Sequence, residues 1–61
     1  MSLGKRIQSY RKQKGLSQEQ LASRLNISRQ ALSKWESDIN VPNIDKIMDV
    51  AKALAVSYTH L

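Results

Sequence analysis

Hydrophobic residues recur along the chain at helical spacing and divide it into short amphipathic segments. Leu3, Ile7 and Tyr10 share the first helical face, and Gly15 is suited to a left-handed position at the end of that helix. Residues 17–25, 28–36 and 43–54 repeat this spacing. Their predicted inner faces consist of Leu21, Ala22, Leu25, Ala31, Leu32, Trp35, Ile44, Ile47, Met48, Ala51 and Leu54. The pattern predicts a chain made of helices.

Residues that cap helices stand at the start of these segments. Ser17 opens the second helix, and Gln20 follows at the spacing of a capping box. The later helices open with residues of the same kind, Ser28, Asn43 and Ser57. Few residues follow Ser57, and a single helical turn is marginal on its own. We therefore expect one all-α domain over residues 1–61, a compact bundle of four to five short helices whose fifth helix is incomplete.

The composition narrows the possible chemistry. The sequence has no cysteine and a single histidine, His60, so it offers neither a disulfide nor a cluster of metal ligands. It also lacks paired carboxylates at catalytic spacing and a glycine-rich phosphate loop. We therefore expect a domain that is not an enzyme and that needs no cofactor or metal. No apolar run approaches the length of a membrane span, which favours a cytoplasmic protein, and DNA binding would make it nucleoid-associated.

Basic residues dominate the first part of the chain. The net charge is +5, and the first acidic residue, Glu19, is preceded by Lys5, Arg6, Arg11, Lys12 and Lys14. A basic region of this kind suits an anionic partner, most simply the phosphate backbone of a nucleic acid. Charge alone is equally compatible with a solubilising surface.

Residues 17–36 have the layout of a helix-turn-helix, with two short helices joined at residues 25–27. The second of these helices has a polar face opposite Leu32 and Trp35, which consists of Arg29, Gln30, Ser33 and Lys34. In the major groove, arginine matches guanine O6 and N7, and glutamine matches adenine N6 and N7. A face that is merely solvated would have the same composition. The position of this polar face directly after the turn favours base reading.

Several stretches resemble, in order and spacing, the Cro and phage-repressor type of helix-turn-helix protein, the XRE family. They are GKRIQSYRKQKGLSQEQLA, SRQALSKWE, Pro42 and IDKIMDVAKALAVS, and together they cover almost the whole chain. The resemblance implies a lambda-repressor-like fold in which Gln18 holds a backbone phosphate and braces the first base-reading residue. It also implies a buried salt bridge between Arg11 and Glu36, two residues that the sequence alone would place on the surface.

The resemblance further implies dimerisation through the fifth helix and its surroundings, here Val56, Tyr58 and Leu61. The phosphate contacts that we expect involve Gln18, Ser28, Lys5, Arg6, Lys12, Asn40 and Asn43. Two residues depart from the family pattern, since Asn26 stands where glycine is preferred and Asp38 where glycine or a basic residue is usual. Asparagine tolerates a left-handed turn position. We expect the Asp38 carboxylate to point away from DNA, because it would repel phosphates.

These features predict a sequence-specific, double-stranded DNA-binding transcriptional regulator, repressor-like, whose third helix reads the major groove. One small domain buries little surface, so we expect a homodimer on a roughly palindromic operator and an effector domain outside this chain. The alternative is a protein-interaction or antitoxin module with the same fold. An exposed apolar cluster on the third helix would favour this alternative. RNA is disfavoured because a helix cannot enter the A-form major groove. Trp35 could stack on bases, but its helical spacing from Leu32 favours a core position.

Overall fold

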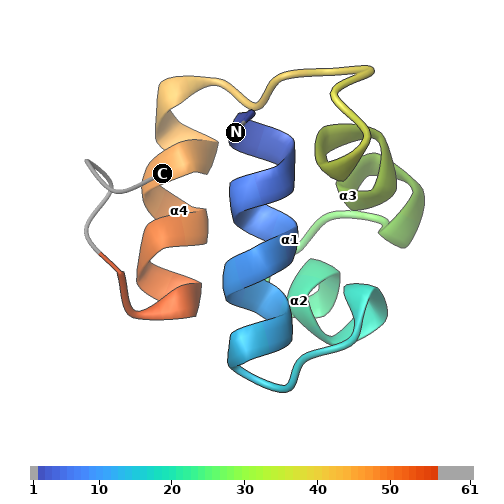
Figure 1. The fold of residues 1–61 in the computed structure, drawn as a ribbon. Helices are drawn as coiled ribbons and strands as arrows, with labels where there is room; N and C mark the ends of the chain where they lie inside the picture. Colours follow the sequence, from blue (N-terminus) through green and yellow to red (C-terminus); the bar gives the residue numbers. More distant parts are fainter. Residues whose placement is uncertain (1, 57–61) are drawn as a thin grey trace.

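The computed structural model describes residues 2–56, which form four α-helices: α1 (Leu3–Gln13), α2 (Gln18–Leu25), α3 (Arg29–Glu36) and α4 (Ile44–Leu54). The predicted all-α bundle is confirmed, while the predicted fifth helix from Ser57 lies outside the described residues. In Figure 1, α1 stands in the centre, with α4 on one side and α2 and α3 on the other. None of the helices in residues 2–56 combines the length and the apolar character needed to cross a membrane.

Each described helix begins at a residue whose side chain accepts a backbone hydrogen bond. Ser17 and Gln20 form the predicted capping box: the Ser17 N–H donates to Gln20 Oε1 at 2.8 Å, and the Gln20 N–H donates to Ser17 Oγ at 3.0 Å. Ser28 and Asn43 cap α3 and α4, as predicted, and Ser2 caps α1. These starts can be predicted because a cap acts within one turn of its own helix.

The four described helices also end alike. A residue with positive φ follows each of them: Gly15 at 70°, Asn26 at 58°, Asp38 at 61° and Ala55 at 55°. The next N–H then donates to the carbonyl five residues earlier, at 2.9–3.1 Å, which is the Schellman pattern of a helix end. The left-handed positions of Gly15 and Asn26 are predicted from the sequence. Those of Asp38 and Ala55 are not, because neither residue type is a reliable sign of that conformation.

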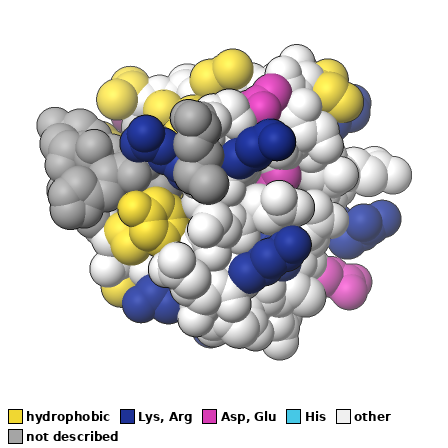
Figure 2. Space-filling view, in the orientation of Figure 1, with side chains coloured by type: hydrophobic (Ala, Val, Ile, Leu, Met, Phe, Trp, Pro, Cys, Tyr) yellow, Lys and Arg dark blue, Asp and Glu magenta, His cyan; other side chains and the backbone are white. Residues whose placement is uncertain are grey.

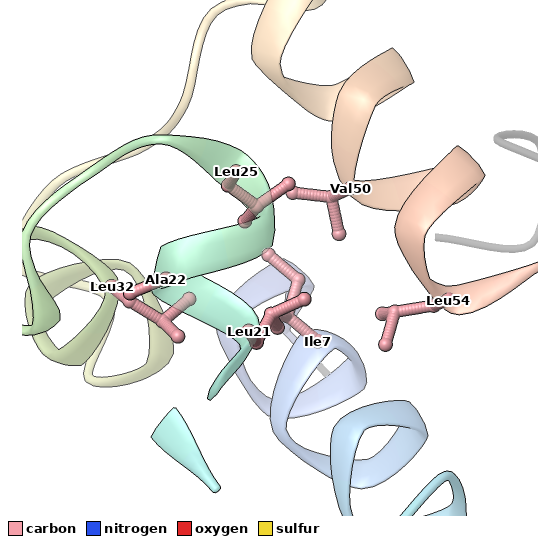
Figure 3. Packing of buried hydrophobic residues seen from close by; sticks show 7 residues of the cluster. All are labelled: Ile7, Leu21, Ala22, Leu25, Leu32, Val50 and Leu54. Carbon is pink, nitrogen blue, oxygen red and sulfur yellow. The ribbon is translucent and has the colours of Figure 1, made fainter. Parts of the chain in front are cut away.

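The core lies where the four described helices face one another. Figure 3 shows side chains from all four converging there: Ile7, Leu21, Ala22, Leu25, Leu32, Val50 and Leu54. Tyr10 and Trp35 are half-buried and pack against this cluster. Trp35 therefore contributes to the scaffold, as its spacing from Leu32 predicts, rather than to a surface for stacking on bases. Burying these side chains is the main favourable contribution to folding in a domain of this size.

The predicted inner face of α4 is partly wrong. Val50 is fully buried although it lies off the predicted stripe, whereas Ile44 and Met48, both on that stripe, are 61% and 44% exposed. Ala51 and Leu54 are buried as predicted, and Ile47 is half-buried. The apolar stripe of α4 is wider than the surface that α1 and α2 offer it. Periodicity identifies such a stripe but does not show which of its edges faces the core.

Candidate nucleic-acid interface

The polar residues predicted to read bases lie on the solvent side of α3. Arg29, Gln30 and Lys34 are exposed and Ser33 is half-buried, while Leu32 is fully buried on the opposite side of the helix. The face carries charged and amide donors together with an amide acceptor, and Ser33 is its smallest residue. This is the set of groups that can match base edges in a major groove.

The N-terminus of α2 offers a second polar feature. The capping box uses the N–H groups of Ser17 and Gln20, and this leaves the N–H groups of Gln18 and Glu19 without a partner among the described residues. Unpaired N–H groups at a helix start, together with the positive end of the helix dipole, favour an anion such as a phosphate. Gln18 is also the residue that the resemblance assigns to a phosphate.

A buried ion pair joins α1 to the end of α3. Arg11 Nε donates to Glu36 Oε2 at 2.8 Å and Arg11 Nη2 donates to Glu36 Oε1 at 3.1 Å, so the pair is bidentate. The third nitrogen, Arg11 Nη1, donates to the Leu16 carbonyl at 2.8 Å. The two side chains are only 9% and 2% exposed. The structure thus brings together the two residues that the resemblance pairs.

Gln18 connects this ion pair to the exposed face of α3. Its Nε2 donates to Glu36 Oε1 at 3.1 Å, and its Oε1 accepts from Arg29 Nη1 at 3.5 Å. Gln18 is half-buried, Glu36 is buried and Arg29 is exposed. One side of the Gln18 amide therefore faces the protein interior and the other faces the predicted base-reading group.

The other predicted phosphate contacts are spread over the surface. Lys5 and Lys12 are exposed and lie two turns apart on one side of α1, whereas Arg6 is half-buried. Asn40 is exposed in the connection between α3 and α4. Figure 2 shows more basic than acidic side chains on the face that contains α1. Lys5, Arg6 and Lys12 lie on α1 and Asn40 follows α3, so these residues do not share an element with Arg29.

Ser28 and Asn43 combine two possible roles. The Ser28 hydroxyl accepts from the Ala31 N–H at 3.0 Å, and the Asn43 Oδ1 accepts from the Lys46 N–H at 2.9 Å. Each side chain uses its oxygen as an acceptor when it caps the helix, and each keeps a donor, an O–H or an NH₂ group, that can still reach a phosphate. Helix capping and phosphate binding are therefore compatible at both positions.

Asp38 has a structural role that sequence reasoning misses. Its Oδ2 accepts from the Ser2 hydroxyl at 2.7 Å, and its Oδ1 accepts from the Gly4 N–H at 3.2 Å, so the carboxylate sits at the N-terminus of α1. A Cβ on Gly4 would lie 2.6 Å from Asp38 Oδ1 and 2.9 Å from the Glu36 carbonyl oxygen, so only glycine permits this approach. In Figure 1 the connection after α3 passes over this end of α1. The two residues are far apart in sequence, and no local pattern signals their contact.

Of the three predicted dimer contacts, only Val56 lies within the described residues. Val56 is half-buried and packs against the core cluster. The other two predicted dimer contacts, Tyr58 and Leu61, lie outside the described residues. Among residues 2–56, no group of three His, Cys, Asp or Glu side chains is placed to hold a metal ion.

Known proteins resemble this chain in both sequence and fold. Over all 61 residues the chain is 39% identical to the HTH-type transcriptional activator BcrR of Enterococcus faecalis, and it spans 30% of that protein's length. The structure matches that of the biofilm regulator SinR in complex with DNA, with a TM-score of 0.88 and 34% identity over 95% of this chain and 94% of that one. It matches the P22 c2 repressor in complex with a synthetic operator with a TM-score of 0.92 and 30% identity over 98% of this chain and 91% of that one.

The family assignment rests on the sequence as well as on the fold. Residues 7–61 match the family described as helix-turn-helix. The matched range includes both helices of the predicted motif and the exposed face that begins with Arg29. Since this match covers most of the chain, the chain belongs to the helix-turn-helix family.

Proposed function

We propose that this domain binds double-stranded DNA at preferred sequences and is the DNA-binding part of a repressor-like transcriptional regulator. The observation that carries the proposal is the solvent-facing group on α3, Arg29, Gln30 and Lys34, held on a helix whose opposite side is buried in the core. Two structurally similar proteins, SinR and the P22 c2 repressor, are described in complex with DNA, which supports the same partner here.

In this proposal α3 lies in the major groove and reads a few base pairs. Arg29 presents two parallel donors to guanine O6 and N7, and Gln30 presents a donor and an acceptor to adenine N6 and N7. The small Ser33 lets the helix approach the base edges, and Lys34 reaches a base or a phosphate. The specificity of Arg29 and Gln30 comes from the match between their donors and acceptors and those of one base.

Phosphate contacts set the position of α3 on the duplex. The free N–H groups at the start of α2, with the remaining N–H of the Gln18 side-chain amide, bind one phosphate. The remaining contacts are the long-range attraction of Lys5, Arg6 and Lys12 and the polar donors of Ser28, Asn40 and Asn43. These contacts carry no base specificity, so they contribute to binding on every duplex and make it dependent on salt.

The domain acts in pairs in this proposal. Two copies on a roughly palindromic operator place their α3 helices about one helical turn of DNA apart. Val56, Tyr58 and Leu61 contribute to the contact between the copies, an effector domain outside this chain controls binding, and the protein resides on the nucleoid in the cytoplasm. The relatives support an additional domain, because the chain spans 30% of BcrR and 48% of the transcriptional regulator ImmR of Bacillus subtilis.

A protein-interaction or antitoxin role would require an apolar surface on α3. The large hydrophobic side chains that are exposed in residues 2–56 are Ile39, Val41, Ile44 and Met48. All of them follow α3 in the chain, and none belongs to the face that carries Arg29. This distribution favours DNA as the partner of the α3 face.

Selection of bound sites from a random DNA pool tests the proposal most directly. We expect enrichment of an inverted repeat whose half-sites are centred about one helical turn apart. A pool that remains random after several rounds, while the protein stays folded, would contradict sequence-specific DNA binding. Enrichment of a single half-site would support DNA binding and contradict the proposed dimer.

Substitution of Arg29 separates base reading from phosphate binding. Arg29→Ala is expected to cost about 1–3 kcal/mol of binding free energy on the preferred site and to relax the preference at one base pair. Lys5→Ala is the matched control, because loss of a phosphate contact weakens binding to all duplexes alike and flattens the dependence on salt. Titration of each variant against the preferred site and its single-base variants distinguishes the two. Equal losses on every sequence for Arg29→Ala would make Arg29 a phosphate contact.

A further inference from the structure

A continuous chain of polar contacts runs from the interior of the domain to the α3 face. Arg11 donates to both oxygens of Glu36, Gln18 donates to Glu36 Oε1 at 3.1 Å, and Arg29 donates to Gln18 Oε1 at 3.5 Å. The chain begins with two buried residues and ends with an exposed one. Its contacts become longer and more exposed toward the surface. Any restraint on the Arg29 side chain through this chain therefore depends on how firmly the buried residues are held.

Glu36 is firmly held. It is 6% exposed, and its two oxygens accept three hydrogen bonds from charged or amide nitrogens. The bidentate contact with Arg11 defines the plane of the carboxylate. An ionised carboxylate can only accept hydrogen bonds, so the group that it presents to Gln18 is always an acceptor.

This acceptor sets the orientation of the Gln18 amide. An amide has a donor end and an acceptor end, and only the NH₂ end can face the Glu36 carboxylate. The oxygen must then point the other way, toward Arg29. A reversed amide would place an oxygen against the carboxylate and an NH₂ group against the guanidinium, which has only donors. Both contacts would be lost together.

We infer that Glu36 is a positioning residue for base readout: through the amide of Gln18, it restrains the Arg29 guanidinium. This inference rests on the proposed function of Arg29. It goes beyond the contact between Gln18 and Arg29 that the resemblance implies, because it states that Glu36, a buried carboxylate at the far end of α3, determines which way the Gln18 amide points. A side chain that is restrained before binding loses less entropy when it meets a base. The buried ion pair thus contributes to specificity as well as to stability.

The substitution Glu36→Gln tests this inference because it removes the group that can only accept. Arg11 donates to both oxygens of Glu36 and shares Oε1 with Gln18, so an amide at position 36 can turn either its oxygen or its NH₂ group toward Gln18. The Gln18 amide is then no longer held in one orientation, and its restraint on the Arg29 guanidinium is weakened. Gln18→Met is the second variant. It removes the link but leaves the Arg11–Glu36 pair in place, so it keeps the test available if Glu36→Gln does not fold.

The first measurement uses the free protein. We expect the NMR order parameter of the Arg29 Nε–H bond to exceed that of Arg24, an exposed arginine for which the described residues provide no partner. The order parameter of Arg29 should fall toward the value of Arg24 in Glu36→Gln and reach that value in Gln18→Met. Two control variants should leave it unchanged: Gln13→Met, which alters an exposed glutamine outside the chain of contacts, and Val50→Ala, which lowers stability without touching it. Equal mobility of Arg29 and Arg24 in the parent, or an equal loss in Val50→Ala, would overturn the inference.

The second measurement uses DNA at a temperature where every variant is folded. The preference for the best base at the position that Arg29 reads should fall about threefold to tenfold in Glu36→Gln and stay unchanged in Val50→Ala. An unchanged preference in Glu36→Gln would overturn the role of Glu36 even if Arg29 is essential. If the parent protein shows no base preference at all, the proposed function fails, and the order parameters still decide whether Glu36 restrains Arg29.

Discussion

The two connections that flank α3 have the same backbone geometry but are held by different chemistry. Asn26 begins the connection before α3 and Asp38 lies in the one after it, with φ values of 58° and 61°. In each case the following isoleucine N–H donates to the carbonyl five residues earlier. Ile27 then packs against the core, whereas Ile39 is 69% exposed. The second connection is held instead by the Asp38 carboxylate at the start of α1.

This difference shows how the orientation of α3 is fixed at both ends. Its N-terminal end is set by α2, its neighbour in sequence, through apolar packing. Its C-terminal end is set by α1, which is remote in sequence, through the Asp38 contacts and the ion pair of Glu36 with Arg11. Apolar contacts are tolerant of small shifts, whereas hydrogen bonds and a bidentate ion pair define direction. We therefore expect substitutions at the two ends to differ in size and in kind.

The largest effect is expected at the C-terminal end, from Glu36→Ala. Removing the carboxylate leaves the Arg11 guanidinium buried without its counter-charge, which should cost about 3–5 kcal/mol in the free energy of unfolding. Denaturant unfolding of the parent and the variant measures this loss. Glu19→Ala is the control, because Glu19 is exposed in the first turn of α2 and its removal should change stability little. A Glu36→Ala variant that unfolds at the same denaturant concentration as the parent would show that the pair carries no stability.

The two ends of α3 also differ in how well the sequence predicts them. Ser17, Asn26 and Ser28 are predicted correctly because each acts on a helix end that lies within a few residues of it. The contact between Asp38 and Gly4 is not predicted, because it joins segments whose proximity depends on the whole fold. Within α4, periodicity finds the apolar stripe but misjudges its buried edge, as the exposure of Ile44 shows.

The candidate site divides along the same line. The exposed group on α3, with Arg29 as its first member, follows from helical spacing alone. The pairing of Arg11 with Glu36 comes only from the resemblance to a family, since a charged residue carries no local sign that it will be buried. The placement of Gln18 between Glu36 and Arg29 needs the structure, because an amide can face either way and its neighbours decide which.

An intermediate effect is expected from the isoleucines that follow the two left-handed residues. Ile27→Ala should lower the free energy of unfolding by about 1–2 kcal/mol, because it removes apolar volume that packs on the core. Ile39→Ala should change it by less than about 0.5 kcal/mol, because the side chain is largely in water already. Thermal unfolding of the two variants at matched concentrations measures the difference. Equal losses would show that both connections are held by apolar packing.

The smallest and most specific effect is expected from glycine at the two left-handed positions. Glycine relieves the cost of positive φ at either site, so Asn26→Gly should stabilise the domain by about 0.5 kcal/mol. At position 38 the same relief is outweighed by the loss of the carboxylate that accepts from Ser2 and Gly4, and Asp38→Gly should destabilise the domain by about 1 kcal/mol. The free energies of unfolding of the two variants should therefore change in opposite directions although the backbone change is the same. If Asp38→Gly also stabilised the domain, the carboxylate would contribute less than the strain of its backbone, and the connection after α3 would be fixed by its helix-end geometry alone.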